Sequence, residues 1–175
     1  MSETRERIAR HVHAHPGVHF NDLVRTLNLA PGQVQYHLKR LCSAGSVVDE
    51  RLYGQTHYYP PDCDEWERGA LSLLRRETAG DVVAVLAEHG TARPQRVADE
   101  LDIARSTLEW HLGHLVEQDV VAKQRDERNH VTLALVRPAV TATLLEAADP
   151  STPARMVDRF TRVADRLLDD SDRDT

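Results

Sequence analysis

The spacing of hydrophobic positions predicts short helices followed by small strands. Apolar residues recur three or four positions apart within residues 4–15, 20–27 and 31–44, and Pro, Gly or Asn separates these runs. After Gly45 the period becomes that of strands, and residues 46–51 and 56–59 flank a turn that contains Gly54. The first third of the chain is therefore predicted to form three helices and a β-hairpin.

The same pattern occurs a second time. Residues 27–47 and 101–121 align at a constant offset of 74 residues, with six identical pairs among 21 positions. The pairs are Leu27/Leu101, Ala30/Ala104, His37/His111, Leu38/Leu112, Leu41/Leu115 and Val47/Val121. The repeat indicates one structural unit built twice.

The second copy is expected to follow the order of the first. We expect Thr78, with Asp81 three residues later, to open a helix that ends at His89 and Gly90. Helices at 94–101 and 104–118 should follow, and then a hairpin of residues 120–123 and 131–133.

Three further helices are predicted outside the two copies. Residues 64–76 place Trp66, Ala70, Leu73 and Leu74 on one face, which fits a linker helix packed against one or both copies. Residues 138–148 and 154–168 should form the other two. In the last helix an apolar arc predicts homodimerisation, and packing back on the linker helix around Trp66 is the alternative. The arc contains Met156, Val157, Phe160, Val163, Leu167 and Leu168, with Arg155, Arg159, Arg162 and Arg166 outside it.

The order helix, turn, helix, β-hairpin resembles the winged helix-turn-helix domain. The string from Tyr36 to Leu41, followed by Ala44-Gly45 and a valine strand, resembles the recognition helix of ArsR- and MarR-type transcription regulators. The chain as a whole is similar to tandem winged-helix regulators of halophilic archaea.

This resemblance implies a fold, a domain division and a function. The fold class is mainly α with small β-hairpin wings (α+β), with two winged helix-turn-helix domains in tandem plus C-terminal helices. The domains are residues 1–61, a linker helix at 62–77, residues 78–137 and C-terminal helices at 138–175. The implied function is a regulator that binds double-stranded DNA through the helix at 31–44 in the major groove and through its wings on the backbone.

Ten side chains are candidates for DNA contact. Gln can bind adenine bidentately, and Lys or Arg can bind guanine or phosphate. The candidates are Gln33, Gln35, Tyr36, Lys39 and Arg40 on the helix, Arg51, Gln55 and His57 on the first wing, and Arg105 and Arg128 in the second copy. An ordinary solvated helix face, and a charged hairpin edge that deters sheet pairing, are the structural alternatives.

The second copy is expected to support structure and assembly more than DNA reading. Glu109, Gly113 and His114 stand where the first copy has Gln35, Lys39 and Arg40. A carboxylate facing phosphates is repulsive, although Glu109 could accept a hydrogen bond from cytosine.

Net charge modifies this picture without excluding DNA. The chain carries 28 acids and 22 bases, giving −6, but residues 1–61 hold seven bases against five acids. Usage that is rich in Arg and Asp and poor in Lys is typical of a halophile, or of a GC-rich genome. In a salty cytoplasm an acidic surface favours solubility. A tandem winged-helix module that binds protein is the alternative function, favoured by the acidic remainder of the chain.

Little in the sequence suggests catalysis, a cofactor or a metal. No phosphate-binding glycine loop, GxSxG elbow or His-Glu-x-x-His motif occurs. His11 and His15 could share a metal on a helix, but no paired-cysteine motif accompanies them, so we expect a non-enzyme without metal or cofactor. His37 and His111 are expected to be satisfied structural groups. Two cysteines, and no apolar run near 18 residues, are typical of a soluble protein of the reducing cytoplasm.

Overall fold

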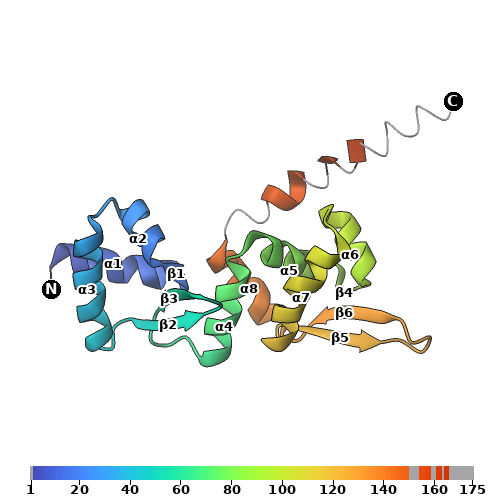
Figure 1. The fold of residues 1–175 in the computed structure, drawn as a ribbon, viewed down its shortest axis with the longest axis horizontal. Coiled ribbons are helices and arrows are strands. Elements are labelled where there is room, and N and C mark those ends of the chain that lie inside the picture. The colour runs from blue at the N-terminus through green and yellow to red at the C-terminus, as the bar shows by residue number, and fades with distance from the viewer. Residues whose placement is uncertain (1, 150–153, 159–160, 163, 166–175) are drawn as a thin grey trace.

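The first copy of the repeat is a three-helix unit with a small antiparallel sheet. The computed structural model describes residues 2–149, 154–158, 161–162 and 164–165. The helices are α1 (Glu3–Ala14), α2 (Phe20–Leu27) and α3 (Pro31–Ser43), and the strands are β1 (Val18–His19), β2 (Val48–Leu52) and β3 (Gln55–Tyr59). The strand order is β1-β3-β2, and both pairings are antiparallel (Figure 1).

The second copy has the same elements in the same order. They are α5 (Glu77–His89), β4 (Thr91–Ala92), α6 (Pro94–Leu101), α7 (Arg105–Glu117), β5 (Val121–Arg125) and β6 (Val131–Leu135). The sheet order β4-β6-β5 matches that of the first copy. Helices α5, α6 and α7 each begin 74 residues after α1, α2 and α3. The repeat therefore extends well beyond the aligned segment and covers all three helices of each copy.

Equivalent backbone conformations end the equivalent helices. Asn28 and Asp102, which follow α2 and α6, have φ of 51° and 53°. Gly45 and Asp119 follow α3 and α7 with φ of 72° and 61°. A left-handed residue lets the chain leave a helix at once while an orphan carbonyl stays satisfied, and Gly, Asn and Asp tolerate it best. These four residues explain why each copy turns sharply at the same two points.

Helix α4 (Glu65–Leu74) lies between the copies, with α8 (Pro138–Ala148) packed against it (Figure 1). One core cluster belongs to the first copy and includes Ile8, Val12, Leu23, Val34, Leu38 and Leu41. A larger cluster combines α4, the second copy and α8. Tyr59, the last residue of β3, is fully buried in this larger cluster. No helix in the described part of the chain is long and apolar enough to cross a membrane.

The structure corrects the predicted start of the second copy. Thr78 does not cap α5, because Arg76 occupies the N-cap position without a side-chain cap bond. Asp81 lies within the helix with an exposed fraction of 0%, and Arg155 Nη2 donates to its Oδ1 at 3.1 Å. Arg155 also pairs with Asp149 at 2.7 Å. A buried carboxylate of α5 therefore anchors the first turn of the C-terminal helical segment.

The C-terminal segment is described only in part. Residues 154–158 are helical, Met156 packs against the larger core, and Val157 is 65% exposed. The other predicted dimer contacts, Phe160, Val163, Leu167 and Leu168, lie outside the described residues. Met156 is therefore committed in part to its own chain, and Val157 is the exposed member of the predicted arc that the structure describes.

Candidate nucleic-acid interface

Helix α3 presents a polar face to solvent and an apolar face to the core. Val34, Leu38 and Leu41 are buried at helical spacing, while Gln33, Gln35, Tyr36, Lys39 and Arg40 are exposed. Pro31 occupies the first turn, where its missing N–H costs nothing. The helix contains no Asp or Glu. Its outer face therefore carries amide donors, one aromatic ring and two cations, with no carboxylate of its own to repel an anion.

Three of these side chains, Gln33, Tyr36 and Arg40, also have partners in α3 or at its N-cap. Gln33 Oε1 accepts a hydrogen bond from the Ala30 backbone N–H at 3.3 Å, so this amide helps to cap the helix. The Arg40 guanidinium carbon lies 5.0 Å from the ring centroid of Tyr36, a cation–π contact. Tyr36 is 52% exposed and lies on the outer face rather than packed beside the hairpin.

A hollow of about 530 Å³ opens beside α3, between the start of α2 and the sheet. Gln35 and Lys39 form one wall, and Asp49 and Tyr58 form the opposite one. Cys42 also lines the hollow, and burial raises the pKa of its thiol to about 11, with Asp49 adding to the shift. This thiol is therefore a weak nucleophile at neutral pH.

The first hairpin offers two of its three predicted contacts. Arg51 and Gln55 are exposed near the turn, where Tyr53 and Gly54 both have positive φ. His57, in contrast, is 2% exposed, and its Nδ1 lies 2.8 Å from the Gly17 carbonyl oxygen. Burial lowers the pKa of His57 to about 4, so the ring is neutral at pH 7. The prediction that His57 contacts the DNA backbone is wrong, because this side chain faces the protein interior.

In the second copy, Arg105 and Lys123 are both paired with one carboxylate, that of Glu109. Arg105 donates to Glu109 Oε1 through Nε and Nη2, each at 3.2 Å, and Lys123 donates to Glu109 Oε2 at 3.1 Å. The bond from Lys123, followed by that from Arg105, lowers the pKa of Glu109. The predicted contact Arg105 is thus engaged within the chain. Arg128 is exposed at the tip of the second hairpin.

The outer face of α7 is partly covered by the hairpin of the first copy. The Tyr53 ring packs edge-on against His114 with centroids 5.2 Å apart, and its hydroxyl donates to Gln118 Oε1 at 3.2 Å. The Arg76 guanidinium lies 5.6 Å from the Tyr53 ring and 5.7 Å from the Trp110 ring. We call Tyr53, Arg76, Trp110, His114 and Gln118 the joint. The joint places the tip of one hairpin on the helix that corresponds to α3.

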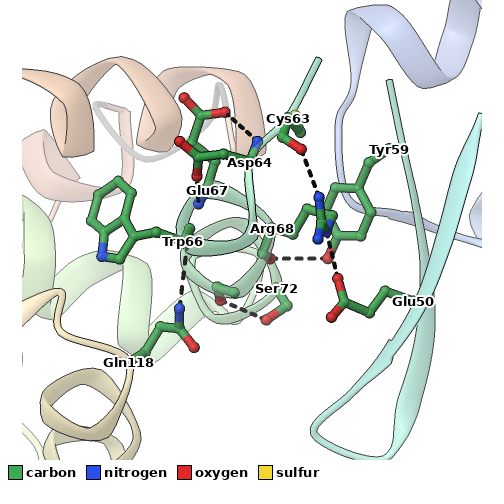
Figure 2. Close-up of polar contacts among 10 residues, drawn as sticks. Glu50, Tyr59, Cys63, Asp64, Trp66, Glu67, Arg68, Ser72 and Gln118 are labelled. Carbon is green, nitrogen blue, oxygen red and sulfur yellow. Dashed lines mark hydrogen bonds and ion pairs between the residues drawn. The ribbon is translucent and has the colours of Figure 1, made fainter. Parts of the chain in front are cut away.

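Figure 2 shows that helix α4 contacts both copies, with Gln118 of the joint on one side and Glu50 and Tyr59 of the first copy on the other. Toward the second copy, Gln118 Nε2 donates to the Trp66 carbonyl at 3.4 Å (Figure 2). In addition, Trp66 Nε1 donates to the Asp119 carbonyl at 3.2 Å. Toward the first copy, Arg68 pairs with Glu50, and Tyr59 Oη donates to the Arg68 carbonyl at 3.0 Å. Helix α4 therefore forms polar contacts with both copies.

Sequence reasoning missed the joint. Its contacts lie between the two copies, whereas the sequence repeat shows only that each copy has the same internal structure. One signal was present: Tyr53 puts a large ring at the tip of a tight turn, where small polar residues are usual. A ring at such a tip needs a partner surface.

The histidines do not assemble a metal site in the described residues. His11 and His15 have ring centroids 4.4 Å apart, but no three His, Cys, Asp or Glu side chains in that part of the chain are grouped to hold a metal. Burial, then His15 and Arg75, lowers the pKa of His11. His37 differs from expectation, because its buried Nδ1 has no hydrogen-bond partner among the described residues. Burial, followed by Arg76, lowers the pKa of His111.

Comparison with known proteins points to a helix-turn-helix domain. Residues 2–71 match a family model described as an N-terminal HTH domain, which spans α1 through most of α4. A protein of Methanocaldococcus jannaschii, named as an uncharacterized HTH-type transcriptional regulator, is 25% identical over 131 residues. The alignment covers 75% of this chain but 33% of that protein, so the chain spans about a third of the relative's length. Residues 2–71 are therefore similar to a helix-turn-helix domain.

Proposed function

We propose that this chain is a sequence-specific DNA-binding transcription regulator with two winged helix-turn-helix units in tandem, and that α3 enters the major groove. The observation that carries the proposal is the exposed, carboxylate-free outer face of α3. In helix-turn-helix proteins the second helix of the motif lies in the groove, and Gln, Lys and Arg read base edges and phosphates there. The helix-turn-helix match over residues 2–71 and the name of the Methanocaldococcus protein support this function.

The first hairpin acts as a wing in this proposal. Arg51 and Gln55 are exposed on adjacent strands close to the turn. Their side chains can bind phosphates, which positions α3 without reading sequence.

The two copies are proposed to divide the work. The α7 face that corresponds to the reading face of α3 holds the Tyr53 ring, and Arg105 and Lys123 are paired with Glu109. DNA that approached α7 would have to displace the hairpin tip and break two ion pairs. The second copy therefore serves mainly as the support that holds the first, with Arg128 as a secondary phosphate contact.

Binding to duplexes selected from a random pool tests this function. Fluorescence anisotropy across a salt range would compare the wild type with a Lys39→Ala, Arg40→Ala variant. A lost base contact costs about 1–3 kcal/mol, and each lost phosphate contact reduces the salt slope by nearly one. An Arg105→Ala, Arg128→Ala variant is the matched control, since it removes the same number of exposed cations from the second copy. Equal losses from the two variants would refute the division of work, and a wild type that binds no duplex would refute the function.

Homodimerisation remains a proposal. Val157 supports it with a 65% exposed apolar side chain, whereas Met156 packs on its own chain. A Phe160→Asp, Leu167→Asp variant is expected to be a folded monomer. Light scattering that gives the mass of one chain for the wild type at assay concentrations would refute the dimer.

A tandem winged-helix module that binds protein is the competing function. Val136, two residues before α8, and Val140, in its first turn, are 39% and 44% exposed and favour an apolar partner. Salt dependence separates the two functions, because DNA binding weakens linearly in log–log coordinates with salt and apolar association does not.

A further inference from the structure

Tyr36 and Arg40 form a pair on the open face of α3. They are four residues apart and therefore adjacent on the helix surface, and the guanidinium carbon of Arg40 lies 5.0 Å from the Tyr36 ring centroid. Helix α3 itself contains no carboxylate that could pair with Arg40, which is exposed. Long helical side chains point back toward the N-terminus, so the Arg40 guanidinium lies over the turn of Tyr36, near the middle of α3.

Contact with the ring prepares the guanidinium for recognition. A free Arg side chain loses about 2 kcal/mol of rotamer entropy when it is fixed, and a cation–π contact reduces the conformations that must be given up on binding. The guanidinium is held beside the ring at its central carbon, and it presents its five N–H donors in a rigid planar fork. A planar fork of this kind matches the O6 and N7 acceptors of guanine in the major groove.

The second copy has an aromatic residue and a histidine at the equivalent positions, and there other side chains of the protein pack against them. Trp110 and His114 stand 74 residues after Tyr36 and Arg40, and their ring centroids are 4.7 Å apart. There, the flat Arg76 guanidinium lies 5.7 Å from the Trp110 ring, and the Tyr53 ring packs against His114. An aromatic and a basic residue at this spacing thus form a surface that holds planar groups. In the first copy the equivalent surface is exposed.

We propose that Arg40 reads one guanine in the major groove and that Tyr36 is the residue that positions it. This inference rests on the proposed DNA-binding function. Tyr36 restrains the guanidinium, and Arg40 donates two hydrogen bonds, one to O6 and one to N7.

Base-modified DNA tests this assignment directly. In a selected duplex, each guanine is replaced in turn by 7-deazaguanine, which lacks the N7 acceptor, or by inosine, which keeps N7 and O6 and loses only the minor-groove amino group. Anisotropy would be measured for the wild type, Arg40→Ala, Tyr36→Leu and the matched control Tyr36→Phe, with folding checked by circular dichroism.

One guanine is expected to be sensitive. There, 7-deazaguanine should weaken wild-type binding roughly three- to tenfold, while inosine has little effect, because half of a bidentate contact is lost. Arg40→Ala should abolish this discrimination, Tyr36→Leu should reduce it, and Tyr36→Phe should keep it.

Two outcomes would overturn the assignment while leaving the proposed function intact. If Arg40→Ala weakens all duplexes equally and lowers the salt slope by nearly one, Arg40 binds a phosphate. If Tyr36→Leu leaves the discrimination unchanged, Tyr36 does not position Arg40. Failure of the wild type to bind any duplex would refute the proposed function, and this inference with it.

Discussion

Replacing Gly69 by Ala tests how closely the first hairpin, α4 and α7 fit together. A Cβ on Gly69 would lie 2.1 Å from Nε2 and 2.2 Å from Cδ of Gln118, far inside van der Waals contact. The Gln118 amide would have to move, and its bonds to Tyr53 Oη and the Trp66 carbonyl would be strained or lost. Gly69 thus leaves room for the side chain that connects three elements.

The expected magnitude is the difference of opposing terms. The clashing atoms belong to the far end of the flexible Gln118 side chain, which can rotate aside, so the cost is the loss of its two hydrogen bonds, about 1 kcal/mol each. Alanine in place of glycine inside a helix returns about 1 kcal/mol. We expect Gly69→Ala to lower the free energy of unfolding by about 1 kcal/mol.

A matched control and a double variant isolate the steric cause. Gly113 lies inside α7, and a Cβ there would meet no described atom within 4 Å, so Gly113→Ala should stabilise by up to about 1 kcal/mol. In a Gln118→Ala background the obstacle is gone, and Gly69→Ala should stabilise as well. Urea unfolding followed by circular dichroism at one protein concentration measures all variants. If Gly69→Ala in the wild-type background stabilises as much as Gly113→Ala does, the close fit at Gly69 is refuted.

Three further predictions concern buried and paired groups. Because burial lowers the pKa of His57 to about 4, the unfolded chain takes up a proton at a higher pH than the folded chain does. The free energy of unfolding should therefore fall by about 3 kcal/mol as the pH drops from about 6.5 to about 4. Urea unfolding of His57→Gln over the same range should show a shallower dependence on pH. With its pKa raised from 9.0 to about 11, the Cys42 thiol should react with iodoacetamide at pH 8 on the order of 100-fold more slowly in the folded than in the urea-unfolded protein, as site-resolved mass spectrometry would show. Arg155→Ala should destabilise by roughly 3 kcal/mol in thermal unfolding because it removes a partner of the buried Asp81, whereas the exposed Arg162→Ala should change little.

Much of the helical framework could be predicted from sequence because its signals are local. The predicted bounds of α2, α6 and α8 are confirmed at both ends, since apolar spacing is combined with Asn28 after α2 and with Pro94 and Pro138 at the first positions of α6 and α8. The strands β1 and β4 were missed. Each has two residues, too few for a period of two to be detected, and each forms only because β3 or β6 lies beside it.

In the candidate site, too, the features set by local spacing were predicted and those set by contacts between distant residues were not. The exposed face of α3 followed from helical spacing around Val34 and Leu38, and the structure exposes the five side chains predicted there. The error at His57 came from reading polarity in place of strand alternation, since His57 and the buried Tyr59 share one face of β3. The pairing of Arg155 with Asp81 joins residues 74 positions apart, and helical spacing alone could not indicate it.

The burial of Tyr59 has a consequence for how the protein opens. Tyr59 ends the sheet of the first copy, yet its ring is enclosed by the core that α4 shares with the second copy, and its hydroxyl is bonded to the Arg68 carbonyl. Opening β3 would therefore uncover part of that core, so the amide protons of β3 and α4 are expected to exchange with solvent in a common event. A fragment cut after Pro61 would leave this ring without its cover. The unit that can fold alone thus extends beyond the point at which the repeat ends.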